Sequence, residues 1–338
     1  MSGVMNNQPP VAVIILNWNG EKLLSEFLPA VLANTNAAIA DIIVADNGST
    51  DGSMELLRTQ FPTVRTITLD SNYGFAEGYN RAIKATMYPY TVLLNSDVAP
   101  AAGWIDSLYL FMETHKHVGA CQPKILSYRQ PDRFEYAGAS GGFIDRNGYP
   151  YCRGRIFSET ELDYGQYDNP VQIFWASGAA LMVRSQLYVD AGGLDADFFA
   201  HMEEIDLCWR ILLAGHDIMV VPSAVVYHLG GGSLPAENPR KTYLNFRNNL
   251  LLLHKNLPDA TRKRKLLKRR LLDTLAWFKF MLTCDFANAN AILRAHNDFR
   301  TMARRYTVHP DRDLLDERTD THRNIITDFY IRGKRRFC

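Results

Sequence analysis

Polar side chains that could hold a ligand follow each of the first four apolar runs in the sequence. They are Asn17 and Asn19 after the first run, Asp46 and Asn47 after the second, Asn72 after the third and Asp97 after the fourth. Ligands of open parallel sheets bind beyond the carboxyl ends of the strands, so these side chains would line one polar crevice. Asn and Asp also favour ordinary turns, and it is therefore the set, rather than any single residue, that indicates a binding site.

A divalent cation could bind at Asp97, which follows the fourth apolar run. A carboxylate there can hold Mg²⁺ or Mn²⁺, which would bridge two phosphates of a nucleotide-sugar and stabilise the leaving diphosphate. One carboxylate makes a weak site, so a partner is required. His228 ends a later apolar run and can be that partner, although an isolated histidine is more often structural. The glycines of the segment Gly230–Ser233 allow a loop to close over phosphates.

Three further carboxylates, Glu203, Glu204 and Asp206, lie at the start of a predicted helix. The helix dipole favours acidic residues there, which gives them a structural explanation. Deprotonation of a sugar hydroxyl, however, needs a base beside the electrophilic carbon, and a carboxylate suits that role. Asp206 stands four residues before Arg210, and we expect the two to form an ion pair. Glu204 faces another direction and is free to act as a base.

Alternating strand and helix patterns would position these residues. Continuous apolar or β-branched runs predict strands at residues 11–16, 42–45, 64–69 and 90–94. Helical spacing of apolar residues predicts helices at residues 21–33, 52–61 and 74–86. The alternation is typical of βαβ units. It predicts a Rossmann-like α/β fold with a mostly parallel central sheet and helices on both faces.

The pattern is looser beyond residue 100. The sequence there predicts a helix at 104–115, a strand at 118–126, a loop or small hairpin at 127–168, a broken apolar segment at 173–183, a helix at 203–214 and a short strand at 218–221. No GxGxxG or GxxxxGK[ST] motif follows the first strand, where the sequence is Asn17-Trp18-Asn19-Gly20-Glu21. Both absences argue against a dinucleotide-dependent dehydrogenase and a P-loop enzyme.

Charge is unevenly distributed along the chain. The whole sequence has 37 Lys and Arg against 36 Asp and Glu, which implies no nucleic-acid partner. Residues 258–338, in contrast, carry a net charge of +9, and the residues before them one of −8. The basic run 262–270 precedes an apolar run, 271–283, that is too short to span a bilayer. The segment 262–283 suits either an anionic membrane surface or packing against the protein body or a second subunit, as in a homodimer.

Cysteine use and the N-terminal segment indicate a cellular compartment. The five cysteines are scattered, with neither a CxxC pair nor a metal-binding spacing, which is typical of a reducing compartment. Residues 1–10 are polar and show no signal-peptide pattern. We therefore expect a cytoplasmic protein, with peripheral attachment to the inner face of the membrane as an extension of that prediction.

Seven segments resemble, in their order, the family-2 inverting glycosyltransferases of the GT-A fold, especially bacterial rhamnosyltransferase-like enzymes. They span about residues 11–255 and are VAVIILNWNG, IIVADNGSTDGS, NYGFAEGYNRA, VLLNSDV, FWASGAALMVRS, GGLDADFFAHMEEIDLCWRILLAGH and VVYHLGGGS. The resemblance implies a GT-A catalytic domain at residues 1–257, with a nucleotide-binding half at about 11–100 and an acceptor half at about 101–257. A basic and apolar helical region would follow at 258–338.

The resemblance implies a role for each matching residue. Asn17 and Asp46 would contact the nucleoside. Ser96 and Asp97 occupy the place of the family's DXD motif, but this chain has Asn-Ser-Asp where the family often has two or three aspartates, which weakens the expected metal site. Other matches would line the nucleotide-sugar pocket together with Asn19 and Asn47, or would adjoin the acceptor. The pocket matches are Asn72, Gly74, Phe75, Gly78 and Asn80, and the acceptor matches are Trp175, Ser177 and Gly178.

The catalytic machinery follows from the same resemblance. His228 matches the family's late metal-binding histidine and would hold Mg²⁺ or Mn²⁺ with Asp97. Glu204 stands where the family usually has its catalytic aspartate, and Glu203 is the alternative base. The base would take the proton of an acceptor hydroxyl as its oxygen attacks the anomeric carbon from the face opposite the diphosphate, so the configuration would invert.

The implied reaction transfers a sugar from a nucleotide-sugar to a glycan or lipid-linked saccharide in cell-surface polysaccharide assembly. dTDP-rhamnose is the first choice of donor, and UDP- and GDP-sugars are the alternatives. Two other classes of protein remain open. A sugar-phosphate nucleotidyltransferase would need a basic, Gly-rich loop after the first strand, and residues 17–21 have none. A non-catalytic carbohydrate-binding relative is favoured by the incomplete DXD motif.

Overall fold

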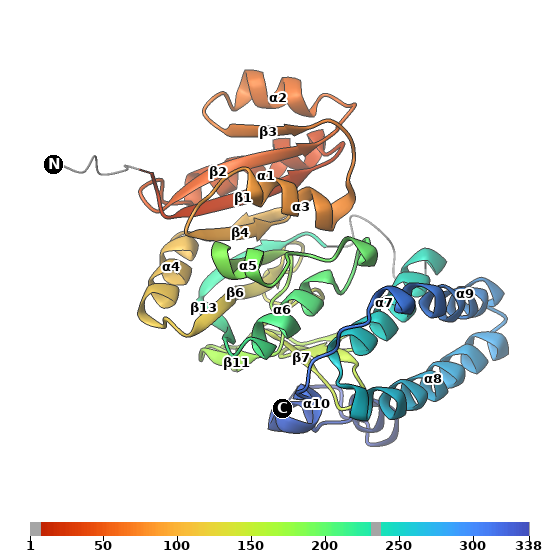
Figure 1. The fold of residues 1–338 in the computed structure, drawn as a ribbon. Helices are drawn as coiled ribbons and strands as arrows, with labels where there is room; N and C mark the ends of the chain where they lie inside the picture. The colour runs from red at the N-terminus through yellow and green to blue at the C-terminus, as the bar shows by residue number, and fades with distance from the viewer. Residues whose placement is uncertain (1–7, 231–237, 338) are drawn as a thin grey trace.

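The computed structural model describes residues 8–230 and 238–337 (Figure 1). Most of the polar N-terminal segment therefore lies outside the described residues. The first part of the chain alternates strand and helix: β1 (Val11–Asn17), α1 (Glu21–Asn34), β2 (Ala40–Asn47), α2 (Ser53–Gln60), β3 (Arg65–Leu69), α3 (Gly74–Lys84) and β4 (Tyr90–Leu94). β1 pairs in parallel with β2 and β4, and β2 pairs in parallel with β3. The predicted parallel βαβ half is confirmed.

The second part completes the central sheet. Its elements are β5 (Val98–Pro100), α4 (Trp104–Thr114), β6 (Val118–Ser127), β11 (Val171–Ile173), β12 (Ala180–Arg184), α5 (Ser185–Asp190), α6 (Glu203–Leu213) and β13 (Asp217–His228). The strand order is β11-β13-β6-β12-β4-β1-β2-β3, with β5 paired to β13. β12 runs antiparallel to β4 and β6, and β13 runs antiparallel to β5 and β11. The α/β fold is as predicted, but the sheet is mixed beyond β4.

Helices cover both faces of this sheet because the sequence of β1 is apolar at successive positions. Side chains of a strand point alternately to its two faces. Val13 and Ile15 belong to one buried cluster, which includes residues of α1 and α4. Ala12 and Ile14 belong to a second cluster, which includes residues of α3 and α6. The carboxyl end of β1 is thereby held between two cores.

Two predictions for the middle of the chain need correction. Residues 127–168, predicted as a loop or hairpin, contain a second, four-stranded antiparallel sheet of β7 (Gly142–Ile144), β8 (Pro150–Cys152), β9 (Arg155–Ile156) and β10 (Glu159–Thr160). The short strand predicted at 218–221 is the first third of β13. Pro222 interrupts the apolar pattern, but the strand continues past a register shift between Val221 and Val225 and ends at His228. A bulge of this kind lets a strand accept a proline.

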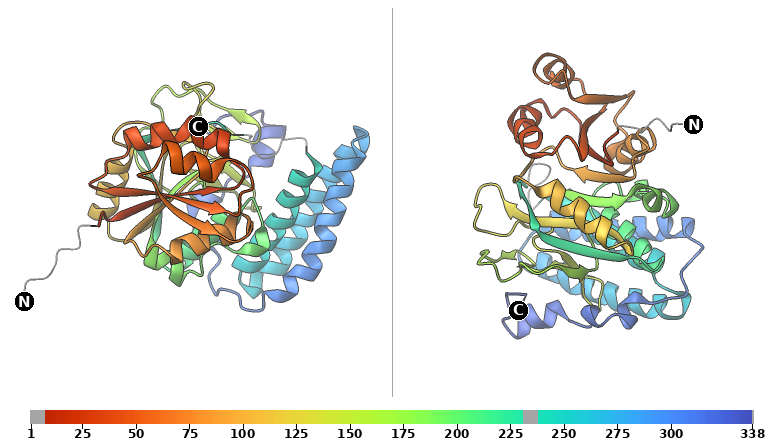
Figure 2. Two further views of the ribbon diagram at one scale, coloured as in Figure 1. Left: turned by 90° about the horizontal axis from the view of Figure 1, so that it is seen from above. Right: turned by 90° about the vertical axis from the view of Figure 1, so that its left-hand side faces the viewer.

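Three long helices form a layer at one end of the molecule, away from the edge strand β3 (Figures 1 and 2). They are α7 (Pro239–Asn256), α8 (Asp259–Leu282) and α9 (Phe286–Met302). The basic and apolar runs at 262–283 form one helix, α8. The chain then returns through α10 (Leu314–Glu317) toward the small sheet, and single turns of other helix types occur at 196–198, 303–305, 319–321 and 327–331. None of the helices described is both long and apolar enough to cross a lipid bilayer.

Candidate functional site

The loops after β1 and β2 are joined by a buried group of side chains. Asn17 Nδ2 donates to Asp46 Oδ1 at 3.0 Å and to Ser49 Oγ at 3.1 Å, and both Asn17 and Asp46 are about 1% exposed. The backbone N–H of Ser49 donates to the other oxygen of Asp46 at 3.0 Å. Asn19 holds the same loop by accepting from the backbone N–H of Thr50 at 2.7 Å. Asn17 Oδ1 is buried without a hydrogen-bond partner in the described part of the chain.

A second group of amides joins the end of β2 to the start of α3. Asn47 Nδ2 donates to Asn72 Oδ1 at 3.0 Å and to the Gly74 carbonyl at 3.1 Å. Gly78 lies one turn further along α3. A Cβ atom there would lie 2.9 Å from a methyl of Leu16 and 3.2 Å from Asn47 Nδ2. Gly78 therefore allows α3 to pack directly on β1, which brings the amide groups beside the Asn17–Asp46 pair.

Asn80 has a different environment from the other predicted pocket residues. Its Nδ2 donates to the Leu194 carbonyl at 2.8 Å, while its Oδ1 accepts from the Tyr188 hydroxyl at 2.6 Å and the Leu194 N–H at 3.0 Å. Both ends of the amide are thus engaged with the loop after α5. In this structure Asn80 fixes that loop to α3.

Asp97 and His228 are in direct contact, although 131 residues separate them in sequence. His228 Nε2 lies 3.1 Å from Asp97 Oδ1, and His228 Nδ1 lies 3.2 Å from Glu135 Oε2. The contact arises because β5, which begins at Val98, pairs with the end of β13 so that Val98 is opposite His228. Asn95 also approaches the histidine, with Nδ2 3.4 Å from Nε2. The two predicted metal ligands therefore share one buried position.

The charges of His228 and Asp97 shift each other's pKa values. Burial disfavours a charge on His228, but its contacts with Asp97 and Glu135 outweigh burial and raise its pKa to about 10. Burial likewise opposes the charge on Asp97, but His228 lowers its pKa below the usual value. An oxygen and a nitrogen ligand suit Mg²⁺ or Mn²⁺ if the remaining ligands are oxygens of substrate or water. Among the described residues no three Asp, Glu, His or Cys side chains form a metal cage.

Glu203 and Glu204 follow a strained turn. Phe199, His201 and Met202 all have left-handed backbones, with φ of 66°, 69° and 75°. Side chains other than glycine rarely adopt such angles, which cost about 1–3 kcal/mol each and persist only where surrounding contacts enforce them.

The enforcing contacts come from α7. Asn248 is fully buried, and its Nδ2 lies within hydrogen-bond distance of three carbonyls of the turn: Phe198 at 2.9 Å, Ala200 at 2.8 Å and His201 at 2.7 Å. Arg247 donates to the Phe198 carbonyl at 2.7 Å and to Asn248 Oδ1 at 2.9 Å. The turn that presents the glutamates is therefore held by a helix more than forty residues further along the chain.

The three carboxylates at the start of α6 differ in protonation. Burial raises the pKa of Glu204 to about 7. Burial, together with the charge of Glu204, raises the pKa of Glu203 well above its ordinary value. Burial would also raise the pKa of Asp206, but Arg210 and Lys255, at 2.7 and 2.8 Å, lower it. The predicted Asp206–Arg210 ion pair is confirmed, and Glu204, partly exposed with a pKa near neutrality, has the properties of a general base.

Short contacts connect Glu204 with the Asp97–His228 pair. A Cβ atom on Gly178 would lie 3.8 Å from Glu204 Cβ and 3.5 Å from the Phe75 ring. The next residue, Ala179, accepts a 3.0 Å hydrogen bond from the Asn95 N–H. Asn95 leads through the partly exposed Ser96 to Asp97. A continuous series of neighbouring residues therefore links Glu204 through Gly178 and Asn95 to Asp97.

The other two predicted acceptor residues, Trp175 and Ser177, are buried beside Gly178. Trp175 Nε1 donates to the Phe143 carbonyl at 2.9 Å, and the Ser177 hydroxyl donates to the Ala137 carbonyl. Both side chains therefore tie the 175–178 segment to the region of the small sheet. Gly178 is the residue of this segment that lies against the glutamate. Residues 231–233 of the predicted glycine loop lie outside the described residues.

Two parts of the site were not predicted from the sequence. Glu135 stands in a stretch interpreted as loop, and nothing in the pattern around it distinguishes it from a surface carboxylate. Arg247, Asn248 and Asn249 are three buried polar residues of α7 that directly precede its buried leucines. Three consecutive polar residues beside the run Leu250–Leu253 could have been recognised as partners of a buried loop.

The fold is that of the GT-A glycosyltransferases. S. aureus TarS 1–349 in complex with UDP-GlcNAc matches with a TM-score of 0.56 and 15% identity over 86% of this chain and 80% of that chain. The mannosyltransferase PcManGT from Pyrobaculum calidifontis, in complex with GDP-Man and Mn²⁺, matches with a TM-score of 0.52 and 15% identity over 90% and 77%. These matches establish the fold in which the candidate site lies.

Sequence comparison gives the family. The model of the family described as Glycosyl transferase family 2 matches residues 12–178, from β1 to the glycine beside Glu204. The N-acetylglucosaminyl-diphospho-decaprenol L-rhamnosyltransferase of Mycobacterium tuberculosis is 28% identical over an alignment of 241 residues, and the match covers 64% of this chain and 75% of that protein. The chain belongs to glycosyltransferase family 2 and is similar to a rhamnosyltransferase.

Proposed function

We propose that this family-2 glycosyltransferase is metal-dependent, inverts the configuration of the sugar that it transfers and acts on a lipid-linked saccharide. The M. tuberculosis relative, named for an N-acetylglucosaminyl-diphospho-decaprenol acceptor and for L-rhamnose, supports this acceptor class and dTDP-rhamnose as donor. UDP- and GDP-sugars are the alternative donors, since solved structures of the same fold are complexes with UDP-GlcNAc and GDP-Man.

The donor would bind across the strand ends. The Asp46 carboxylate would accept from the nucleoside. Asn17 Oδ1, which has no hydrogen-bond partner among the described residues, would take a second donor there. Further contacts would come from the loops that the amide pairs hold together. These contacts involve Asn19, Asn47, Asn72, Gly74, Phe75, Gly78 and Ser96. Asn80 would act indirectly, by fixing the loop at Leu194 to α3.

Mg²⁺ or Mn²⁺ would bind at Asp97 and His228, because Nε2 and Oδ1 are close enough to contact one cation. When bound, the cation would neutralise charge on the departing nucleoside diphosphate. Glu135, on the far side of the imidazole, would keep the proton on Nδ1, and a bound cation would take the place of the proton on Nε2. Such carboxylate–histidine pairs orient the ring and strengthen its binding of metal.

Glu204 would be the catalytic base, with Glu203 as the alternative. The Glu204 carboxylate would accept the proton of the acceptor hydroxyl while the oxygen forms its bond to the anomeric carbon and the bond to the diphosphate breaks. Its pKa of about 7 supports this role, since it is charged for part of the time at neutral pH and still basic. Trp175, Ser177 and Gly178 would shape the acceptor side.

The helical region at 258–338 would bring the enzyme to its acceptor. α8 exposes an apolar stripe of Leu267, Leu271, Leu275, Phe278 and Leu282, each more than half exposed. Exposed Lys263, Arg264 and Lys268 stand on the same helix. An apolar stripe with basic neighbours suits the surface of an anionic membrane. Cosedimentation with phosphatidylglycerol vesicles should be lost in Leu271→Glu; self-association abolished by that change would indicate a homodimer instead.

The proposal rests on the contacts that link Glu204 through Gly178 and Asn95 to Asp97 and His228. Purified protein would be given dTDP-rhamnose, UDP-sugars or GDP-sugars with Mn²⁺ and a prenyl-diphosphate-linked N-acetylglucosamine, and released nucleoside diphosphate would be measured. We expect turnover with one donor, its loss in EDTA and in Glu204→Gln, and normal turnover in Glu26→Gln, an exposed residue of α1. Consumption of no nucleotide-sugar, or a product of retained configuration, would contradict the proposal.

A further inference from the structure

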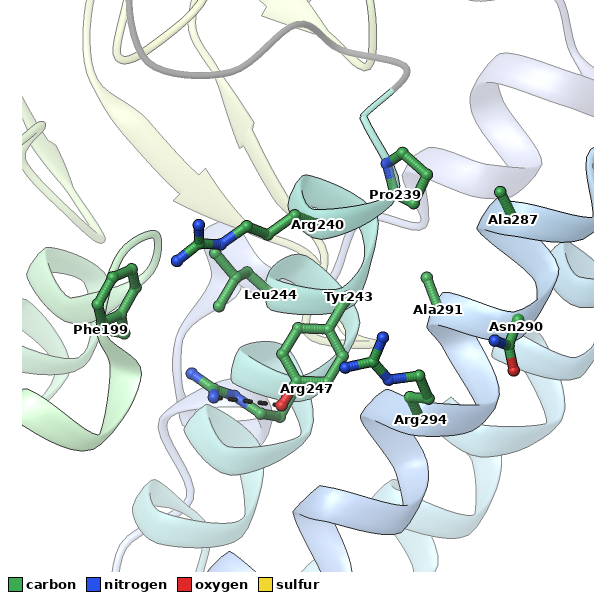
Figure 3. Close-up of a pocket in the computed structure, with 10 residues that line it drawn as sticks. All are labelled: Phe199, Pro239, Arg240, Tyr243, Leu244, Arg247, Ala287, Asn290, Ala291 and Arg294. Atoms are coloured by element: carbon green, nitrogen blue, oxygen red, sulfur yellow. Dashed lines mark hydrogen bonds between the residues drawn. The ribbon is translucent and has the colours of Figure 1, made fainter.

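A pocket of about 440 Å³ lies between α7 and α9, beside the turn that precedes the glutamates (Figure 3). Three of its lining residues are arginines: Arg240 and Arg247 from α7 and Arg294 from α9. Tyr243 stands among them, and Phe199 of the turn closes one side (Figure 3). The pocket is therefore basic, and through Phe199 and Arg247 it adjoins the turn that precedes Glu203 and Glu204.

Within residues 8–230 and 238–337, no ion pair neutralises the positive charge of this pocket. In the described ranges, no carboxylate lies within ion-pair distance of Arg240, Arg247 or Arg294. Arg240 lies over the Phe199 ring at 5.3 Å and Arg294 over the Tyr243 ring at 5.5 Å. Asp298, one turn after Arg294 on α9, accepts instead from the Tyr243 hydroxyl at 2.6 Å.

Arginines held in this way are suited to phosphate. A guanidinium presents paired N–H donors that match two phosphate oxygens, and stacking on an aromatic ring leaves those donors free. Arg247 already donates to backbone carbonyls, which leaves Arg240 and Arg294 as the groups able to bind a ligand. Two such residues on facing helices fit a diphosphate better than a single phosphate.

Phe199 connects the pocket with the reaction centre. Its ring is stacked by Arg240 on the pocket side, while a Cβ atom on Gly74 would lie 3.9 Å from the same ring. Phe199 therefore separates the pocket from the donor loops. On the opposite side, the lining Ala287 is preceded by Phe286, which is 59% exposed, and Leu282 is 85% exposed. An apolar chain leaving the pocket would meet these residues and then the stripe of α8.

We infer that the pocket binds the diphosphate of a prenyl-diphosphate-linked acceptor, through Arg240 and Arg294. The inference rests on the proposed function and specifies where its acceptor binds. The saccharide would extend past Phe199 toward Glu204, and the prenyl chain would leave over Phe286 toward the membrane surface. The headgroup phosphates of membrane lipids could bind the same arginines, so the test must distinguish a prenyl diphosphate from a lipid headgroup.

The probe is geranyl diphosphate, titrated calorimetrically into the full chain in EDTA so that no cation holds it at Asp97 and His228. The variants are Arg240→Gln, Arg294→Gln and the double change. The matched control is Arg300→Gln, an exposed arginine further along α9 that does not line the pocket. We expect the wild type to bind, the double variant to bind at least ten times more weakly, and Arg300→Gln to stay within a factor of two. Thermal unfolding of each variant checks the fold.

Vesicles of phosphatidylglycerol test whether the pocket binds lipid headgroup phosphates instead. We expect the double variant to cosediment with them within a factor of two of the wild type. The inference is refuted if the wild type does not bind geranyl diphosphate, if Arg300→Gln weakens binding as much as the double change, or if the double change reduces vesicle binding alone. Failure of the proposed function has a different result, because the pocket would then bind geranyl diphosphate while the protein consumes no nucleotide-sugar.

Discussion

Asn248 provides a sharp test of how the glutamates are presented. It touches no predicted substrate position, yet its amide nitrogen is shared among three carbonyls of the strained turn at distances of 2.7–2.9 Å. Asn248→Ala removes two N–H donors and the acceptor of Arg247 Nε. At 0.5–1.5 kcal/mol for each buried hydrogen bond, we expect the free energy of unfolding to fall by about 2–4 kcal/mol.

The catalytic effect should exceed the effect on donor binding. Without the amide, the left-handed angles of Phe199, His201 and Met202 lose their support, and the turn can relax. A displacement of the base by about 1 Å costs on the order of 100-fold in rate. We therefore expect kcat to fall about 100-fold, while the KM for the nucleotide-sugar, which binds at the strand ends, changes less than threefold.

A second variant separates hydrogen bonding from packing. Asn248→Asp preserves the shape of the side chain but offers only acceptors to three carbonyl oxygens. If the amide acts as a donor, Asn248→Asp should be at least as damaging as Asn248→Ala. If the side chain only fills space, it should be milder. Urea unfolding and steady-state kinetics measure both effects, with Asn245→Ala, a partly exposed residue of α7, as control. A kcat within twofold of wild type in both Asn248 variants would refute the reasoning.

Three further predictions address the charged and packed parts of the site. A carboxylate acts as a base only when it is deprotonated, and burial raises the pKa of Glu204 to about 7. We therefore expect kcat/KM to be constant above pH 8 and to fall tenfold per pH unit below pH 6. A profile that is flat from pH 5 to 9 would exclude this role. Glu135→Gln should raise the Mn²⁺ concentration needed for half-maximal activity by about 10–100-fold, and an unchanged requirement would separate Glu135 from metal binding. Gly78→Ala forces a methyl to within 2.9 Å of Leu16 and should lower the free energy of unfolding by about 1–3 kcal/mol in urea titrations; an unchanged midpoint would show that α3 shifts without cost.

Local pattern was sufficient to predict the half of the fold that ends at β4. There β1, β2 and β4 contain continuous apolar runs, β3 is rich in β-branched residues, and each helix carries its own amphipathic face, so local sequence and tertiary packing agree. The crevice residues at these strand ends could be named for the same reason, since the ends of parallel strands meet at one edge of the sheet. Their proximity is a consequence of topology that alternation alone predicts.

Non-local pairings limited the prediction in the second half. β13 was shortened because Pro222 hides a strand that continues through a bulge, and the contact of its last residue with Asp97 depends on pairing with β5. The small sheet of β7–β10 consists of strands of two or three residues, which leave almost no periodic signal. Glu135 belongs to the same region, and its partner is 93 residues away. Contacts of this kind are set by the assembled fold, so pattern along the chain does not show them.

The C-terminal helices are bound to the catalytic part through more than their covalent link. Arg247 donates to the turn before the glutamates and also lines the arginine pocket, so one side chain connects the pocket with that turn. Beyond α9 the chain returns to the small sheet, where Phe337 packs against Phe143 at 5.1 Å and the Ile325 N–H donates to Asp145 at 3.2 Å. These contacts tie the C-terminal region to the catalytic part at both of its ends. In the proposed function, the stripe on α8 would then set the orientation of Glu204, the proposed base, relative to the membrane surface.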